Sequence, residues 1–329
     1  MDLLQFEQIV KEHLVNQPFI SESANISFET ITKNNDTVLR GLIIREPDTN
    51  ITPTIYIDGF LKAINENEIS VEQALTEMTE LYQSYQVDKI ENTEVLLNKD
   101  NIYFKIINAD LNQEYLQERP HRLMPNSDLA MMYAIKVDGF IDKNAVTNIA
   151  ITNHIANHLH LSEEEIYQLA MAQTEKMFPP VLSTMDDVIF QMMGMEHTST
   201  NWIDADIIPL SMDMPMLILT NENKTYGAST IAYPGLLEKI SEKMGGDMIM
   251  LPSSIHETIL LPINELSSAS FEELKSMIQD INRDNVSDEE ILSDHPYVYD
   301  ADKKVLISYE DYTDSEHASE KVTQHYCHH

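Results

Sequence analysis

The chain has 329 residues, of which 55 are Asp or Glu and only 21 are Lys or Arg, so its formal net charge at pH 7 is −34. A surface this acidic repels phosphate, which argues against nucleic acids and anionic membranes as direct partners, because both are bound by clustered Lys and Arg. Hydrophobic residues make up 43% and charged residues 23% of the chain, as in globular proteins, so we expect a packed core and either one large or two ordinary domains.

The first 140 residues alternate between helix and strand patterns. Apolar residues at helical spacing predict a helix over 3–14, and a capping box formed by Ser70 and Gln73 predicts another over 71–85. Pro53 lacks an amide hydrogen, which places its strand at a sheet edge or at the start of the pairing. The strands predicted in this part are 26–32, 38–44, 51–57, 102–107 and 129–137, of which the first two form a hairpin.

The second half of the chain continues the mixture. Two further capping boxes, Ser162 with Glu165 and Ser270 with Glu273, mark helix starts. The helices predicted here are one before 162 and those over 163–178, 186–193, 234–244 and 270–281. The predicted strands are 216–220, 226–231, 248–251, 258–261, 297–299 and 305–308.

Helices and strands follow one another without a repeated βα rhythm. This order predicts an α+β fold with mixed, mostly antiparallel sheets and flanking helices. We expect an N-terminal α+β region at 1–140, a C-terminal α+β region at 141–308, and a disordered acidic and His-rich tail at 309–329.

Location and cofactors follow mainly from motifs that the sequence lacks. It contains neither an apolar run of membrane-spanning length nor the basic and apolar regions of a signal peptide, so we expect a cytoplasmic protein. Cys327 is the only cysteine, which excludes an internal disulfide and a cysteine-rich zinc site. There is no GxGxxG or GxxxxGK[ST] motif to cradle phosphates, and no cofactor is expected.

A candidate metal site consists of His154 and His158. Their i, i+4 spacing would place two imidazoles on one helix face, as in zinc sites, with a carboxylate from 163–165 as a further ligand. No Glu follows His154, so the HExxH pattern of zinc hydrolases is not met. The competing interpretation is a pair of polar histidines at the exposed end of a helix.

A candidate catalytic site consists of Ser254, His256 and Glu257, which lie in a polar segment between two apolar strands. In an extended chain Ser254 and His256 share one face and Glu257 points to the other, so these three cannot form a relay unless a remote acid completes it. The competing interpretation is a turn in which Ser and His satisfy backbone groups.

The only notable basic cluster is formed by Arg119, His121 and Arg122. Guanidinium groups fit carboxylate or phosphate geometry, so the cluster is a candidate anion clamp. In a chain this acidic, we expect instead that these bases pair with the protein's own carboxylates.

Several strings in the sequence resemble one family. They are 216–221 (MLILTN), 226–229 (YGAS), 251–257 (LPSSIHE) with 259–262 (ILLP), and 286–295 with Glu290 and LSDH. The family is an uncharacterised bacterial one, domain of unknown function 5688, found in Gram-positive gut bacteria and their mobile elements. The resemblance implies a cytoplasmic accessory protein and indicates 252–257 as the place to look for a site, but it supplies no activity.

Two functions remain open on the sequence alone. The first is a non-enzymatic acidic protein that binds a basic or DNA-handling protein, with DNA mimicry as a sharper version. The second is a hydrolase that uses Ser254, His256 and Glu257, or a metal held by His154 and His158. The charge favours the first.

Overall fold

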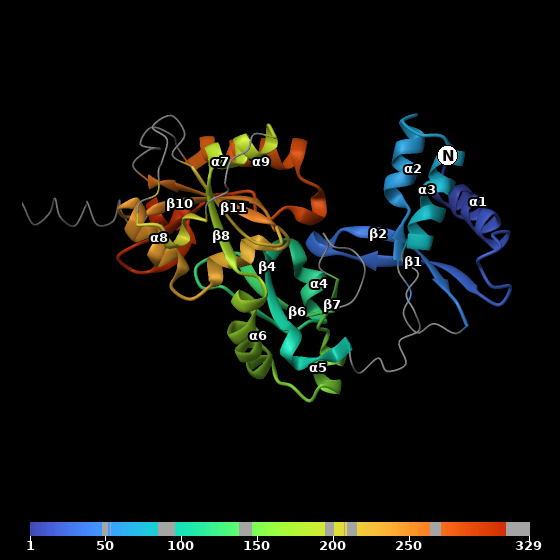
Figure 1. The fold of residues 1–329 in the computed structure, drawn as a ribbon, viewed down its shortest axis with the longest axis horizontal. Coiled ribbons are helices and arrows are strands. Elements are labelled where there is room, and N and C mark those ends of the chain that lie inside the picture. The colour runs from blue at the N-terminus through green and yellow to red at the C-terminus, as the bar shows by residue number, and fades with distance from the viewer. Residues whose placement is uncertain are drawn as a thin grey trace, which may run out of the picture. The chain divides into compact units, whose positions relative to one another are not determined.

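A computed structural model describes residues 1–47, 52, 54–84, 96–137, 147–194, 201–206, 208, 216–263 and 271–313 (Figure 1). The chain divides into two compact units, one of residues 1–98 and 138–143 and one of residues 99–137 and 144–329. Every strand pairing in these ranges is antiparallel, and helices flank the three sheets, which confirms the α+β class. No helix in the same ranges has the length and apolar character needed to cross a membrane.

The N-terminal unit is a three-stranded sheet, in the order β1-β2-β3, with three helices. Its elements are α1 (Leu3–Val15), β1 (Asn25–Thr32), β2 (Val38–Arg45), β3 (Thr54–Tyr56), α2 (Asp58–Asn65) and α3 (Val71–Ser84). β3 is an edge strand, as Pro53 predicts, and the Ser70–Gln73 capping box is formed by its two reciprocal hydrogen bonds.

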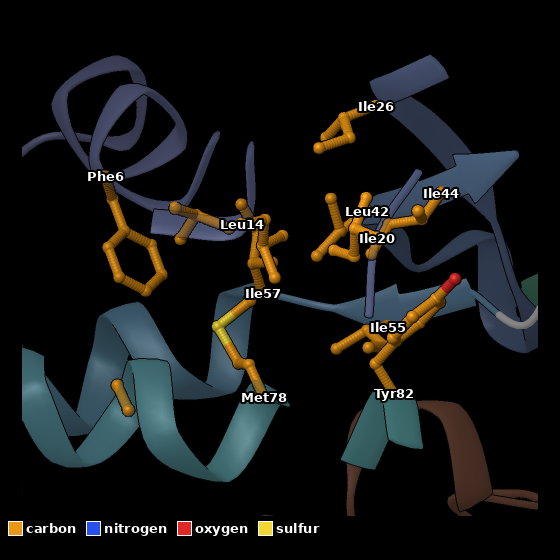
Figure 2. Close-up of a cluster of buried hydrophobic side chains, with 12 residues drawn as sticks. Phe6, Leu14, Ile20, Ile26, Leu42, Ile44, Ile55, Ile57, Met78 and Tyr82 are labelled. Atoms are coloured by element: carbon orange, nitrogen blue, oxygen red, sulfur yellow. The ribbon is translucent and has the colours of Figure 1, made fainter. Parts of the chain in front are cut away.

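One face of this sheet forms the core of the unit with α1 and α3. Ile26 lies opposite Ile44 on neighbouring strands, so their side chains share a face. Figure 2 shows these strand residues gathered with Phe6 and Leu14 of α1 and with Met78 of α3. The unit therefore has a hydrophobic cluster of its own.

The second unit contains two sheets. The four-stranded sheet has the order β4-β6-β5, with β7 also paired to β6, and the six-stranded sheet has the order β13-β12-β10-β11-β9-β8. The elements around the first sheet are β4 (Ile102–Asn108), α4 (Gln113–Gln117), β5 (His121–Leu123), β6 (Leu129–Lys136), β7 (Asn148–Ala150), α5 (Asn153–His158) and α6 (Glu163–Met177).

The six-stranded sheet carries the C-terminal half of the chain. Its strands are β8 (Pro180–Thr184), β9 (Leu217–Asn221), β10 (Met248–Ser254), β11 (Glu257–Pro262), β12 (Tyr297–Asp300) and β13 (Val305–Ser308). The helices in this part are α7 (Met185–Met192), α8 (Leu236–Met244) and α9 (Phe271–Asn285), with the 3-10 helices η6 (Gly227–Ala232) and η8 (Asp288–Glu290). α9 packs Ile278 against β10 and β11.

The two units are not divided at a single position, since residues 99–137, expected in the N-terminal region, group with the second unit. β4 pairs with β6 along its whole length, which keeps residues 99–137 with the C-terminal part of the chain. Order also extends beyond 308: residues 309–313 are helical, and the hydroxyl of the buried Tyr312 donates to Asp247 (2.6 Å). The remainder of the tail lies outside the described residues.

Some local structure in the second unit differs from the prediction. The segment 226–231, predicted as a strand, forms the 3-10 helix η6, and the helix α4 and the strands β5, β7 and β8 were not predicted. Tyr226 has a left-handed backbone (φ +55°), which breaks an extended run. β8 begins with Pro180 at the edge of its sheet, where a missing amide hydrogen is tolerated.

The outer edge of β4 is closed by side chains. The amide of Phe104 donates to Thr174 Oγ1 of α6 (3.1 Å), and that of Ile106 donates to Ser229 Oγ of η6 (3.2 Å). Both hydroxyl residues are buried. They satisfy edge amides that have no strand partner on that side, and they attach α6 and η6 to β4.

We expect Ser229→Ala to lower the free energy of unfolding of this unit by about 1–3 kcal/mol, because the buried Ile106 amide loses its acceptor. Trp202 is the only tryptophan and belongs to this unit, so its fluorescence in urea reports the unfolding. Ser276→Ala, at an exposed position of α9, is the control and should change the value by less than about 0.5 kcal/mol. Equal effects of the two substitutions would contradict the role given to Ser229.

Candidate functional site around His256

His256 lies in the tight turn between β10 and β11. Ser254 pairs with Glu257, so Ile255 and His256 alone form the loop of this hairpin. The Ser254 hydroxyl accepts a hydrogen bond from the His256 amide (3.0 Å). This local contact is the one that the turn interpretation describes.

Three distant segments hold the backbone of the turn. The Ile255 amide donates to the Glu290 carbonyl (2.8 Å), the Ala228 amide donates to the Ile255 carbonyl (3.2 Å), and Thr220 Oγ1 donates to the His256 carbonyl (2.8 Å). β9, η6 and η8 thus meet at one two-residue loop. The backbone groups of this loop are satisfied without water.

Both ring nitrogens of His256 are engaged. Nδ1 accepts a hydrogen bond from the Tyr226 amide (3.1 Å), so the ring proton is on Nε2. Nε2 lies 3.3 Å from Glu290 Oε1 and can donate to it. With one nitrogen occupied by a backbone amide and the other by a carboxylate, His256 presents no free nitrogen to take a proton from a substrate.

Tyr226 connects this turn to the four-stranded sheet. Its ring stacks on His256, with 5.7 Å between centroids and 26° between planes, and Lys105 Nζ lies 3.8 Å from the same ring centroid. The left-handed backbone of Tyr226 costs energy for a residue with a side chain, and such strain concentrates at functional sites.

Lys105 is buried at 6% exposure on β4. It donates to Asn148 Oδ1 of β7 (2.8 Å) in addition to its contact with Tyr226. An ammonium group removed from water needs such compensation, and the aromatic face supplies part of it. The row Lys105, Tyr226, His256 and Glu290 therefore runs from the interior of the unit to its surface.

The predicted catalytic residues are brought only partly together. Ser254 Oγ contacts the backbone of His256, and the carboxylate that faces the imidazole is Glu290 and not Glu257. The remote acid that a relay requires is thus present, but the ring nitrogen that would serve the nucleophile is bound to the Tyr226 amide. Catalysis by Ser254, His256 and Glu257 stays a prediction for which this geometry gives no support.

His154 and His158 both lie on α5 and are exposed, as in the competing interpretation of polar histidines at the exposed end of a helix. Within the described ranges no group of three His, Cys, Asp or Glu side chains is arranged to hold a metal ion. The carboxylate of Glu163 is engaged elsewhere, since Arg122 donates two hydrogen bonds to it.

The basic cluster separates in the structure. Arg122 binds Glu163 and Glu164 and stacks on Tyr167, as expected for a base that pairs with the protein's own acids. Arg119 instead stacks on Tyr115 at 3.7 Å and donates to its carbonyl. These contacts do not form an anion clamp from the two guanidinium groups.

A second, partly buried polar network was not predicted. Asp128, before β6, accepts hydrogen bonds from Tyr297 (2.5 Å), from Asn108 (2.6 Å) and from His295 Nε2 (3.2 Å). Burial raises the pKa of Asp128, but these three donors outweigh it and hold the pKa below its usual value. The network links the end of β4 and the start of β6 to β12, and so joins the two sheets.

His256 can be tested as a structural residue. His256→Ala removes the acceptor of the Tyr226 amide and should cost about 1–3 kcal/mol in the free energy of unfolding, read from Trp202 fluorescence in urea. His256→Asn keeps an acceptor at the position of Nδ1, so it should retain most of that stability. An equally large loss in both variants would show that the amide contact is not what His256 contributes.

The sequence held some signals for these residues. A lysine inside the apolar run IYFKII marks Lys105 as unusual, and Glu290 and His295 stand in the strings that carry the family resemblance. Tyr226 stands in the string YGAS, which lies against the LPSSIHE turn. Nothing local indicates that Asp128 faces His295, because 167 positions separate them.

Comparison with known proteins agrees with the resemblance. No curated protein and no solved structure matches the chain. A family model described as "Family of unknown function (DUF5688)" matches residues 3–301, which covers both units. The chain therefore belongs to this family of unknown function.

Proposed function

We propose that the chain works by binding a partner with a basic surface and not by catalysis. The observation that supports this most is the way its own bases are used. Four of its five arginines, Arg40, Arg45, Arg122 and Arg283, are in ion pairs with its own carboxylates. These arginines are paired within the chain, and because 55 acidic residues stand against 21 Lys and Arg, acids remain in excess for solvent or a partner.

Lysines and arginines often engage more than one acceptor. Arg283 binds both Asp280 and Asp284, and Lys243 donates to three backbone carbonyls. Lys239 binds Asp204, whose side chain is 89% exposed. Exposed pairs of this kind are screened and exchange readily, so a cationic partner can compete for the same carboxylates.

Charge on this scale acts on association as well as on solubility. A strongly negative surface attracts a positive one over roughly the Debye length and raises the association rate, while it excludes nucleic acid itself. Proteins that handle DNA carry the basic surfaces that match it. In the sharper form of the proposal, the acidic surface takes the place of DNA on such a partner. The chain would then be an accessory protein of a mobile element.

The test is a pull-down from bacterial lysate with the immobilised full chain, at low and at high salt, followed by identification and purification of what is retained. We expect a basic protein that binds the purified chain at low salt and is released at high salt. Duplex DNA should compete if the partner's DNA-binding surface is the one used. Failure to retain a basic protein, or retention that salt does not change, would contradict the proposal.

A further inference from the structure

A depression of about 310 Å³ lies in the second unit, between the residues before β6, the η6–α8 segment and the β12–β13 hairpin. Its walls are mainly apolar and include Met124, Ile231, Leu237 and Leu306, of which the last three are buried. The volume is at the lower end of the range of ligand sites. It suits a single side chain better than a large ligand.

The rim of this depression carries one ion pair. Lys304 Nζ, in the turn after β12, binds Glu238 Oε1 of α8, and both residues line the cavity. Lys304 is held in a left-handed conformation (φ +56°), and its side chain is 60% exposed. The chain thus places an ammonium group on the Glu238 carboxylate beside an apolar hollow.

We propose that this depression, the α8 pocket, receives a lysine side chain of a cationic partner, and that Lys304 is the internal competitor for Glu238. This rests on the proposed function and names the place where the partner docks. A lysine combines a four-carbon apolar stem with an ammonium head, and the α8 pocket combines apolar walls with a carboxylate at the rim. The contact of Lys304 shows that an ammonium group fits that carboxylate.

An anionic occupant fits less well. It would have to use Lys304, whose ammonium is already bound to Glu238, and to approach a chain of net charge −34. The Tyr299 hydroxyl also lines the α8 pocket, and its pKa is raised by burial and by the negative charge of Glu238. Charge complementarity therefore favours a cation.

The experiment uses n-butylammonium as the probe and follows the methyl signals of Ile231, Leu237 and Leu306 by NMR in the full chain. We expect saturable shifts of these signals, and weaker ones with n-butanol, which has the same stem without the charge. Glu238→Gln should weaken probe binding at least threefold, whereas Lys304→Gln should strengthen it at least threefold. Opposite effects from the two partners of one ion pair are the signature of competition, because a purely structural pair would give losses in both.

Lys303→Gln is the matched control, since Lys303 lies in the same turn but binds Asp300, and it should leave probe binding within twofold of the wild type. Equal binding of n-butanol, or weakened binding in Lys304→Gln, would overturn the proposal. The pull-down separates it from the proposed function. A basic partner retained equally by wild type and Glu238→Gln would leave that function standing and overturn the α8 pocket as its docking site. Probe binding with the expected opposite effects, but without a basic partner, would support a cation site and contradict the wider function.

Discussion

Gly227→Ala is expected to lower the free energy of unfolding of the second unit by about 3 kcal/mol or more. A Cβ atom at this position would lie 2.1 Å from Thr220 Oγ1 and 2.3 Å from the His256 carbonyl oxygen. The second contact is with backbone, so no side-chain rotation relieves it. The substitution should separate η6 from the His256 turn and break the bond from Thr220 to that turn. Urea unfolding followed by Trp202 fluorescence measures the loss.

Gly245→Ala is the matched control for this prediction. Gly245 caps α8 with a left-handed backbone (φ +86°), and a Cβ atom there would meet no atom within 4 Å, so alanine should cost only about 1–2 kcal/mol through backbone strain. The φ of Gly227 is not in the left-handed range, so its expected cost is steric. A loss at Gly227 no larger than that at Gly245 would show that the turn tolerates separation from η6.

Asp128→Ala is expected to cost about 3–5 kcal/mol, because it leaves a buried tyrosine hydroxyl, an amide and a histidine without their common acceptor. Asp128→Asn keeps the shape and one acceptor oxygen, so it should cost less. The loss in the free energy of unfolding is again measured by Trp202 fluorescence in urea. Equal stability of Asp128→Ala and wild type would mean that the two sheets do not depend on this network.

The same network predicts a dependence on pH. Burial lowers the pKa of His295, but the hydrogen bond and the charge of Asp128 outweigh it and raise the pKa above 6.5. This part of the stability is complete below pH 6.5 and is lost as the pH rises through the raised value. The part due to Asp128, whose pKa is lowered, is complete above pH 3.8 and is lost as the pH falls through the lowered value.

The stability difference between wild type and His295→Gln should therefore be largest between about pH 4 and 6.5. Urea titrations of both proteins across pH 3–9 measure it. Surface carboxylates titrate alike in the two proteins, so the difference isolates the pair. A difference that grows steadily above pH 8 would contradict the assignment of the stabilising charge to His295.

Local patterns determined most elements of the fold. The capping box of Ser162 and Glu165 forms as predicted at the start of α6, and the hairpin of β12 and β13 lies where the apolar alternation placed it. A cap or an alternating face depends on residues a few positions apart, so the sequence displays it directly. The 3-10 helix η6 was predicted as a strand because its small and β-branched residues suit a strand. Its contacts with Ile106 and with the His256 turn favour the tight helix instead.

The sequence by itself determined the charge, the α+β class and His256 as the residue to examine. Only the tertiary structure decided what surrounds His256: Tyr226 and Glu290 contact its ring nitrogens from 30 and 34 positions away. Contacts of that kind depend on the packing of segments that are distant in the sequence, and they leave no periodic trace along the chain. The same holds for residues 99–137, which belong to the second unit because β4 pairs with β6.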